Sequence, residues 1–237
     1  ILIENAKIID GTGVPAFQGG VAIIENRIQE IGDISNYVAS HRVDVGGNIV
    51  CPGFIDCHTH DDCVLLDDPQ MAFKVTQGVT TVVAGNCGIS LAPFSPSQDW
   101  ELPVPMSLLG KKDKYQFPHF SDYIKAFKNS PPAVNAAFLC GHNTLRAEAM
   151  GGQVKRPASE KEIGRMCERA RDSINSGAIG ISSGLMYPAG SEAPTSEVSA
   201  VAAVVGKLGG LYATHLRDEG EHLLQSVEEA AEIGRVG

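Results

Sequence analysis

The chain has no long apolar run, no signal-like N-terminus and little clustered positive charge. No stretch of its 237 residues approaches the roughly 20 continuous apolar residues that a transmembrane helix needs. The net charge is −9, and the densest basic stretch is the short, interrupted run at residues 111–114. Because nucleic-acid binding draws on clustered Lys and Arg, we expect no nucleic-acid partner. The missing apolar run and signal-like N-terminus lead us to expect no membrane partner and a cytoplasmic location.

Closely paired cysteines and several common catalytic loops are also missing. The six cysteines form no CxxC pair, which argues against a disulfide framework. The sequence contains no GxxxxGK[ST] phosphate loop and no GxGxxG turn. Gly180 and Gly184 frame Ser182 at GxSxG spacing, but Ser182 lies inside an expected strand rather than at the strand-to-helix turn of a nucleophile elbow. A serine hydrolase, a nucleotidase and a dinucleotide-dependent enzyme therefore lack support.

The first 48 residues predict a small β domain. Short apolar runs alternate with glycine-containing turns, as at residues 10–13, and this pattern is typical of antiparallel strands. We expect residues 1–48 to form a β-sandwich-like domain, the N-terminal half of a composite domain.

From residue 49 onward, strand-like runs alternate with helical patterns. The expected strands are residues 53–60, 80–87, 134–142, 178–183 and 211–215. Such a rhythm is typical of α/β proteins with parallel strands. We expect residues 49–237 to supply the first five βα units, the N-terminal part, of a (β/α)8 TIM-type barrel.

Helix-capping residues, glycines and prolines predict three helices and one long loop. Ser159 and Glu162 form a capping-box pattern before a helix that ends at Gly177, and a second helix opens after Pro194. A third is expected over residues 219–233. Residues 91–120, rich in proline, are expected to be a long loop that either walls a substrate pocket or is a structural excursion.

Histidines and a cysteine lie where the expected strands end. Side chains alternate along a strand, so His58 and His60 point the same way and can bind one cation. Cys87, His142 and His215 end three further strands, and the carboxyl ends of barrel strands meet at one rim. Imidazole and thiolate are ligands that zinc prefers, so a hydrolytic metalloenzyme is the leading hypothesis.

Each of these residues also has a purely structural interpretation. An HxH pair alone is more often hydrogen-bonded packing, and a strand-end cysteine is usually an inert core residue. Asp56 shares the face of His58 and either orients a ligand imidazole by accepting a hydrogen bond from it or forms a buried ion pair. Asp61 and Asp62 suit a helix cap or a loop anchor.

Several motifs together resemble the amidohydrolase superfamily and, within it, the D-aminoacylases (N-acyl-D-amino-acid deacylases). The superfamily pattern is Pro-Gly-Phe-Ile-Asp-Cys-His-Thr-His at residues 52–60. The narrower resemblance rests on residues 77–81, 85–88, 141–146, 177–187 and 213–219. It spans essentially the whole chain. Hydantoinases, the nearest rivals, carry a carboxylated lysine after the fourth strand, and residues 178–183 contain no lysine.

The resemblance implies a set of metal ligands. In this family a cysteine bridges two metal positions, and Cys87 matches it. One tight zinc is then expected on Cys87, His215 and a histidine after the sixth strand. A second, weaker position is expected on His58, His60, Cys87 and an aspartate after the eighth strand, which would be the general base. Both remaining residues are expected beyond Gly237, so we interpret the chain as a fragment.

Three residues are expected to contact the substrate. Tyr187 matches a family tyrosine that contacts the substrate carboxylate. His142 lies at an expected strand end with Arg146 shortly after it, and we interpret both as substrate contacts rather than metal ligands.

These observations predict zinc-dependent hydrolysis of N-acyl-D-amino acids, giving a carboxylate and a free D-amino acid. The expected partner is a small N-acyl amino acid, and the sequence indicates no oligomeric state. Two alternatives stay open: an amidohydrolase acting on dipeptides or cyclic amides, as hydantoinases do, and a non-catalytic metal-binding member of the fold.

Overall fold

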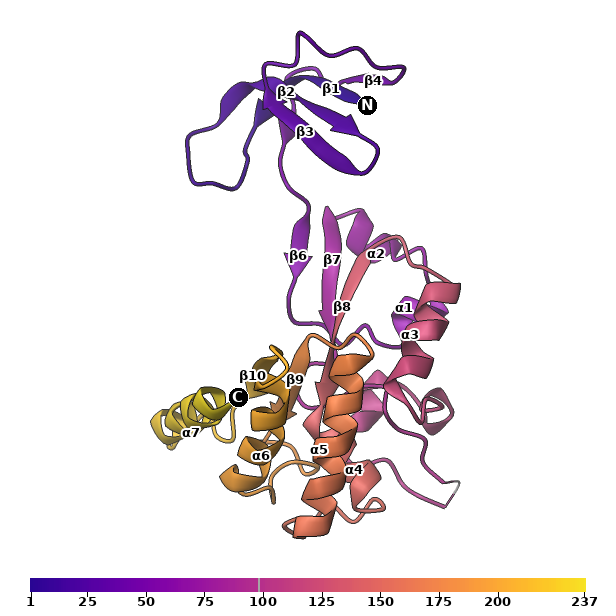
Figure 1. Ribbon diagram of the computed structural model, residues 1–237, viewed down its shortest axis with the longest axis vertical. Helices are drawn as coiled ribbons and strands as arrows, with labels where there is room; N and C mark the ends of the chain where they lie inside the picture. Colours follow the sequence, from indigo (N-terminus) through magenta and orange to yellow (C-terminus); the bar gives the residue numbers. More distant parts are fainter. Residues whose placement is uncertain (98) are drawn as a thin grey trace. The chain divides into compact units, whose positions relative to one another are not determined.

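The chain is divided into two compact units, Ile1–Phe54 and Ile55–Gly237. The computed structural model describes residues 1–97 and 99–237 (Figure 1). The boundary expected after residue 48 lies earlier than this division, because Ile49–Val50 form a strand that pairs within the first unit. Among the described residues, no helix combines the length and apolarity that a bilayer span requires.

The first unit is one mixed sheet. Its strands are β1 (Leu2–Ile8), β2 (Phe17–Ile24), β3 (Arg27–Gly32), β4 (Arg42–Asp44) and β5 (Ile49–Val50). Strands β1 to β3 pair antiparallel, as the glycine-containing turns predict, whereas β4 and β5 pair parallel to β1. Ala6, Ile8 and Val21 form its small core. The expected β-sandwich is not confirmed, because the described strands of this unit lie in a single sheet.

The second unit contains a curled parallel sheet, a half-barrel with strand order β10-β9-β8-β7-β6. Its strands are β6 (Phe54–Asp56), β7 (Val79–Ala84), β8 (Asn135–Gly141), β9 (Gly180–Gly184) and β10 (Leu211–His215). Each strand from β7 to β10 pairs parallel with the next one. This confirms the prediction that parallel strands alternate with helices. The carboxyl ends of parallel strands therefore meet at one edge.

Helices separate most of these strands (Figure 1). Their bounds are α1 (Val64–Asp67), α2 (Ala72–Val75), α3 (Phe120–Asn129), α4 (His142–Ala149), α5 (Glu160–Asn175), α6 (Thr195–Gly206) and α7 (Leu223–Val236). Helix α5 has the predicted capping box, in which Ser159 and Glu162 each bond the other's backbone N–H. Helix α7 begins later than expected, because the Asp218 carboxylate accepts the N–H groups of Gly220 and His222 in a turn.

The segment expected to be a loop, residues 91–120, packs into the main core through residues 91–97 and 99–120, and residue 98 lies outside the described residues. Short 3-10 helices, Met106–Leu109 and Lys112–Lys114, interrupt this segment. Its buried side chains are Leu91, Phe94, Met106, Leu109, Tyr115 and Phe117, and they join the cluster formed by the sheet and its helices. This insertion therefore stabilises the second unit as well as connecting β7 to α3.

Candidate metal centre

Cys87 lies in a tight turn that follows β7. Gly85, Cys87 and Gly88 all have positive φ angles, of 81°, 53° and 77°. A Cβ at Gly85 would lie 2.0 Å from the Leu139 carbonyl oxygen, so only glycine fits there. A positive φ is uncommon for a residue with a side chain and indicates that the surroundings hold Cys87 in place.

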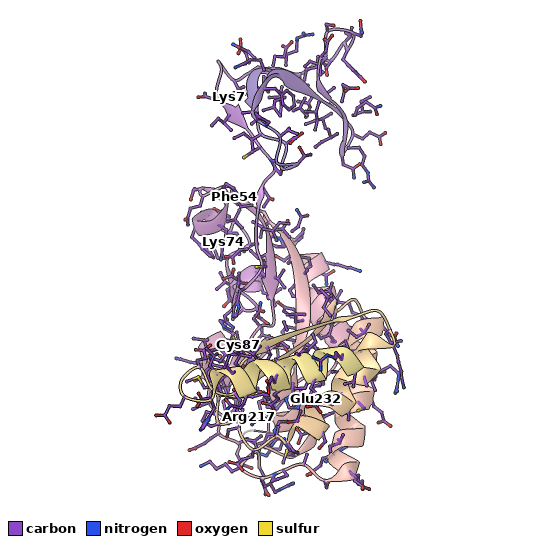
Figure 2. All side chains as sticks on the ribbon, turned by 90° about the vertical axis from the view of Figure 1, so that its left-hand side faces the viewer. Lys7, Phe54, Lys74, Cys87, Arg217 and Glu232 are labelled. Carbon is purple, nitrogen blue, oxygen red and sulfur yellow. The ribbon has the colours of Figure 1, made fainter. Side chains whose placement is uncertain are left out.

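Three polar side chains hold this turn. The Asp62 carboxylate accepts the Gly85 N–H at 3.1 Å, and the Asn86 amide donates to the Val83 carbonyl at 2.9 Å. The Ser182 hydroxyl, from β9, accepts the Gly88 N–H at 2.9 Å and donates to the Gly85 carbonyl. Because these groups are buried, the Cys87 thiol, labelled in Figure 2, has a well-defined position at the carboxyl end of the sheet.

His58 and His60 follow β6 on either side of an anchored residue. Thr59 is buried, and its N–H and hydroxyl both donate to the Val83 carbonyl at 3.1 Å. The expected strand over residues 53–60 is wrong in its length, because regular pairing ends at Asp56. The imidazoles still converge: candidate ligand atoms of His58, His60 and Cys87 all lie within 4.8 Å of one another.

The Cys87 sulfur lies close to imidazoles from two other strand ends. Its Sγ is 3.1 Å from His58 Nε2 and 3.8 Å from Nδ1 of His215, the last residue of β10. Two ligands of one tetrahedral zinc, with Zn–S about 2.3 Å and Zn–N about 2.0–2.1 Å, lie roughly 3.5 Å apart. Both observed distances are close to this value, so the Cys87 sulfur is placed to share a metal with either histidine.

Protonation and hydrogen bonding also fit a metal site. Nδ1 of His60 and Nε2 of His215 are buried without a hydrogen-bond partner among the described residues. Burial lowers the pKa of His60, with a contribution from His58, and burial raises the pKa of the Cys87 thiol. Neutral imidazole is the ligating form, and a bound cation favours the thiolate. The donor set is therefore suited to a soft or borderline divalent metal such as zinc.

Tyr187 lies beside this cluster in the loop that follows β9. Its hydroxyl is 3.2 Å from His215 Nδ1, and the two rings are 4.8 Å apart. The phenol therefore lies close enough to the candidate metal ligands to reach a molecule bound there.

His142 and Arg146 do not reach the cluster, contrary to the expected substrate contacts. Both side chains are fully buried on α4 and bind Glu197 of α6. The His142 Nε2–Glu197 Oε1 distance is 3.1 Å, and Arg146 also donates to the carbonyls of Ala189, Val154 and Arg156. Their polar groups are used within the protein because residue 142 begins a helix rather than ending a strand.

Asp56 forms an ion pair, as one of its two interpretations expected, but its side chain is 35% exposed rather than buried. Its Oδ2 lies 2.7 Å from Lys74 Nζ, and Asp61 lies 3.1 Å from the same ammonium. The hydrogen bond from Lys74 holds the pKa of Asp56 below its usual value. Asp56 also accepts the His58 backbone N–H at 3.4 Å, but no hydrogen bond to an imidazole is seen among the described side chains.

Glu197, Ser182 and Glu219 are site-supporting residues that the sequence analysis missed. Glu219 Oε1 lies 3.6 Å from His215 Nε2, and Glu197 and Ser182 are fully buried. The sequence places Glu197 in the first turn of a helix, where acidic residues are ordinary. The spacing of Glu219, four residues after His215, is a weak signal, since β10 ends between them and a turn intervenes.

The chain resembles characterised and solved deacylases over nearly its whole length. It is 46% identical to a D-aminoacylase of Alcaligenes xylosoxydans xylosoxydans over 99% of this chain and 48% of that protein. A solved D-aminoacylase, described as having a binuclear metal center, matches with a TM-score of 0.95 at 46% identity, covering 99% of this chain and 49% of that one. The N-acyl-D-glutamate deacylase of Bordetella bronchiseptica, solved with zinc and a phosphonate inhibitor, matches at 0.91 and 35% identity, covering 99% and 48%.

The chain thus spans about half the length of the relatives that it matches. The family assignment rests on the chain's own residues, since residues 42–234 match the family model. This range includes β4 to β10 and all the candidate ligands. The chain belongs to the amidohydrolase family.

Proposed function

We propose that this chain is part of a zinc-dependent deacylase that hydrolyses N-acyl-D-amino acids to a carboxylate and a free D-amino acid. The observation that carries the proposal is that the Cys87 sulfur lies 3.1 Å from His58 Nε2 and 3.8 Å from His215 Nδ1. The D-aminoacylase and the N-acyl-D-glutamate deacylase, which share the fold closely, support the substrate class. The exposed edges of the half-barrel at β6 and β10 are consistent with the first five strands of a (β/α)8 barrel.

Zinc is proposed at two positions that share Cys87. The tight position would use Cys87 and His215 together with a ligand outside residues 1–237, and the weaker one would use His58, His60 and Cys87. When bound, zinc lowers the pKa of a coordinated water and polarises the amide carbonyl. A general-base aspartate is likewise proposed outside this chain.

The chain's own residues would position the substrate and the ligands. The Tyr187 hydroxyl, 3.2 Å from His215 Nδ1, would donate to the substrate carboxylate. The buried turn around Cys87 would keep the thiolate fixed, and the pair of Glu197 with Arg146 would hold the loop that carries Tyr187 through the Ala189 carbonyl.

The alternatives differ in what the site requires. A hydantoinase-like enzyme would use a carboxylated lysine after the fourth barrel strand, but β9 (Gly180–Gly184) has none. A non-catalytic metal-binding protein would bind zinc without turnover. The observed position of the Cys87 sulfur favours the deacylase over the first alternative, and turnover separates it from the second.

The test compares three substrate classes with the full-length, zinc-loaded protein. We expect release of free amine from N-acetyl-D-amino acids to be at least a hundredfold faster than from the L-enantiomers or from hydantoins. Cys87→Ala should abolish this activity, whereas Cys167→Ala, a half-buried cysteine on α5, should leave it within about twofold of wild type. A preference for hydantoins, or zinc binding without turnover, would reject the proposal.

A further inference from the structure

The loop between β9 and α6 carries Tyr187 and is bound at its start to the end of β10. The Leu185 N–H donates to the carbonyl of His215, the last residue of β10, at 3.2 Å. Two residues further on, the Tyr187 carbonyl accepts the N–H groups of Gly190 and Ser191, both at 2.8 Å. Backbone bonds therefore close the turn that presents the phenol.

Arg217 binds the other end of this loop. Its guanidinium donates to the carbonyls of Ser191 and Ala193, each at 2.9 Å. Arg217 follows His215 by two residues, so both ends of the loop are attached to the same short segment of chain. One set of bonds therefore places the Tyr187 hydroxyl 3.2 Å from His215 Nδ1.

Helix α7 holds the guanidinium in this position, and Figure 2 shows Arg217 beside this helix. Glu229 accepts bonds from Nε and Nη2 of Arg217 at 2.9 and 2.8 Å, a bidentate geometry that a lysine cannot form. The hydroxyl of Thr195, the first residue of α6, also donates to Glu229 at 2.7 Å. The Glu229 side chain is only 12% exposed, so water screens this pair less than it screens a surface ion pair.

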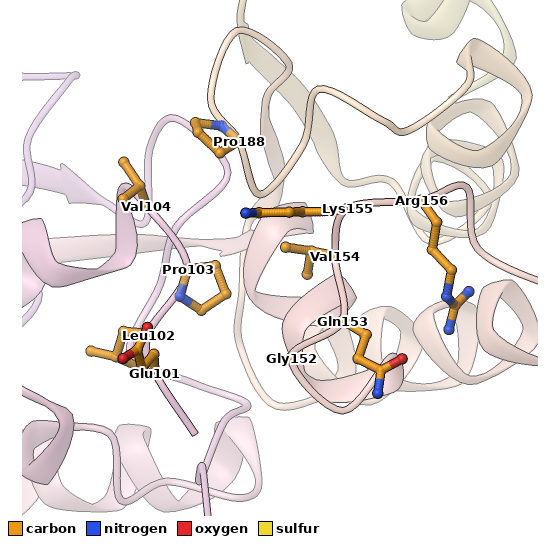
Figure 3. A pocket seen from close by; sticks show the side chains of 10 residues that line it. All are labelled: Glu101, Leu102, Pro103, Val104, Gly152, Gln153, Val154, Lys155, Arg156 and Pro188. Carbon is orange, nitrogen blue, oxygen red and sulfur yellow. The ribbon is translucent and has the colours of Figure 1, made fainter. Parts of the chain in front are cut away.

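The opposite side of the loop borders a cavity of about 650 Å³, which Pro188 and Val104 help to line (Figure 3). There the Ala189 N–H donates to the Val104 carbonyl at 3.1 Å, and the Ala189 carbonyl accepts a bond from Arg146 of α4. Because a cavity supplies no packing atoms, the position of the loop depends on its polar bonds. Those from Arg146 attach it to α4, whereas those from Arg217 attach it to the segment that carries His215.

We propose that the Arg217–Glu229 pair is a positioning device for Tyr187, which fixes the phenol relative to the candidate metal ligands. This inference rests on the proposed function, in which the phenol donates to the substrate carboxylate. Loss of the pair would release the loop and weaken substrate binding. The metal ligands would stay in place, because they lie at strand ends and in the turn around Cys87. The expected effect is therefore on KM more than on kcat.

The test compares Arg217→Lys with Arg235→Lys in the full-length, zinc-loaded protein. Lysine keeps the charge at residue 217 but cannot bind Glu229 and two carbonyls together. We expect Arg217→Lys to raise KM for an N-acetyl-D-amino acid about tenfold and to leave kcat within about threefold. Arg235, exposed on α7 and without a hydrogen-bond or ion-pair partner among the described residues, is the matched control. Its substitution should leave both constants within about twofold of wild type.

A double-mutant cycle separates positioning from a general structural effect. If Arg217 acts through the phenol, Arg217→Lys should change KM by less than about twofold in a Tyr187→Phe background. Two effects that multiply, an unchanged KM in the single variant, or loss of bound zinc by elemental analysis would each overturn the proposal. Glu229→Gln keeps the size of its side chain and tests the same pair if Arg217→Lys does not fold. It should raise KM about threefold.

Hydrogen exchange distinguishes failure of this proposal from failure of the proposed function. The Gly190 and Ser191 N–H groups are bonded to the Tyr187 carbonyl, so their exchange reports on the loop without any substrate. In the full-length protein Arg217→Lys should speed this exchange about tenfold, and Arg235→Lys should not change it. If wild type does not hydrolyse N-acetyl-D-amino acids but this difference is found, the deacylase proposal fails and the positioning of the loop stands. Unchanged exchange in Arg217→Lys overturns the positioning proposal alone.

Discussion

At the scale of single residues, the Cys87 thiol is the group on which the proposed metal centre depends. Its sulfur lies near both His58 and His215, whereas His58 and His60 form with it one cluster that does not include His215. Removing the sulfur therefore affects both proposed metal positions, and removing His58 affects only one of them.

We accordingly expect Cys87→Ala in the full-length protein to lose most of its bound zinc and His58→Ala to lose much less. Elemental analysis after gel filtration measures this, with Cys167→Ala as the control for removal of a thiol. A full zinc content in Cys87→Ala would contradict the bridging role.

Asp62 predicts a pH dependence of stability. It is completely buried, and burial raises its pKa from 3.8 to about 7 although it accepts the Gly85 N–H. Between about pH 4 and pH 7 the native state keeps a proton that the unfolded chain releases, so the contribution of Asp62 to stability is complete at low pH and is lost as the pH rises. The loss is at most on the order of 4 kcal/mol.

Asp62→Asn should remove this part of the pH dependence, because the amide oxygen can still accept the Gly85 N–H and carries no charge. Urea unfolding of the metal-free protein at several pH values measures it, with the exposed Asp68→Asn as the control. If wild type and Asp62→Asn lose stability in parallel as the pH rises, Asp62 ionises without cost and the argument fails.

The sequence could predict the residues that converge but not those that support them. His58, His60, Cys87 and His215 follow apolar strand runs, and parallel topology alone brings such ends together. Asp62 is buried by residues distant in the chain, including Tyr123, whose hydroxyl bonds its carbonyl. A charged residue next to a ligand motif gives no local sign that it will be buried, so its anchoring role was only one of two interpretations.

At the scale of elements, α4 and α6 are joined by a buried charge network. Glu197 binds His142 and Arg146, and all three side chains are fully buried. Their mutual attraction must offset the cost of removing charges from water, and loss of one partner leaves the others unpaired.

Glu197→Ala should therefore lower the free energy of unfolding by about 3–5 kcal/mol. The exposed Glu192→Ala, which lies just before α6, should change it by less than about 0.5 kcal/mol. Urea unfolding measures both. A loss below about 1 kcal/mol for Glu197→Ala would show that Arg146 finds other partners, and the account of the network would be wrong.

Elements with strong local signals were predicted, and those without were missed. Helix α5 has a capping box and a helical apolar period, and its bounds match the expectation. Helix α4 begins directly at the end of β8, so the continuous apolar run up to residue 142 reads as one strand. That single error in placing His142 produced the expected substrate contacts of His142 and Arg146. Strands β4 and β5, of three and two residues, are too short to show any alternation.

At the scale of the whole molecule, the half-barrel is open at both edges. Strands β6 and β10 end the sheet order, so each has one neighbouring strand in the described part of the chain. Apolar side chains near these edges are exposed: Ile55 by 66%, Leu211 by 61% and Leu224 on α7 by 75%. Unpaired edge strands with exposed apolar groups are sites of association between chains.

The 237-residue segment expressed by itself should therefore self-associate and should lack deacylase activity. Closing a barrel satisfies the N–H and C=O groups of its edge strands, and here β6 and β10 can satisfy theirs only by pairing with another chain or with water. Light scattering coupled to gel filtration, combined with amine-release assays, measures both properties. Charged substitutions at the edge, such as Leu211→Lys, should reduce the association without restoring activity, whereas Leu108→Lys, away from both edges, should not reduce it. A monomeric wild-type segment with zinc-dependent deacylase activity would contradict this, because the open edges would then be stable in water and the five strands would already contain a working site.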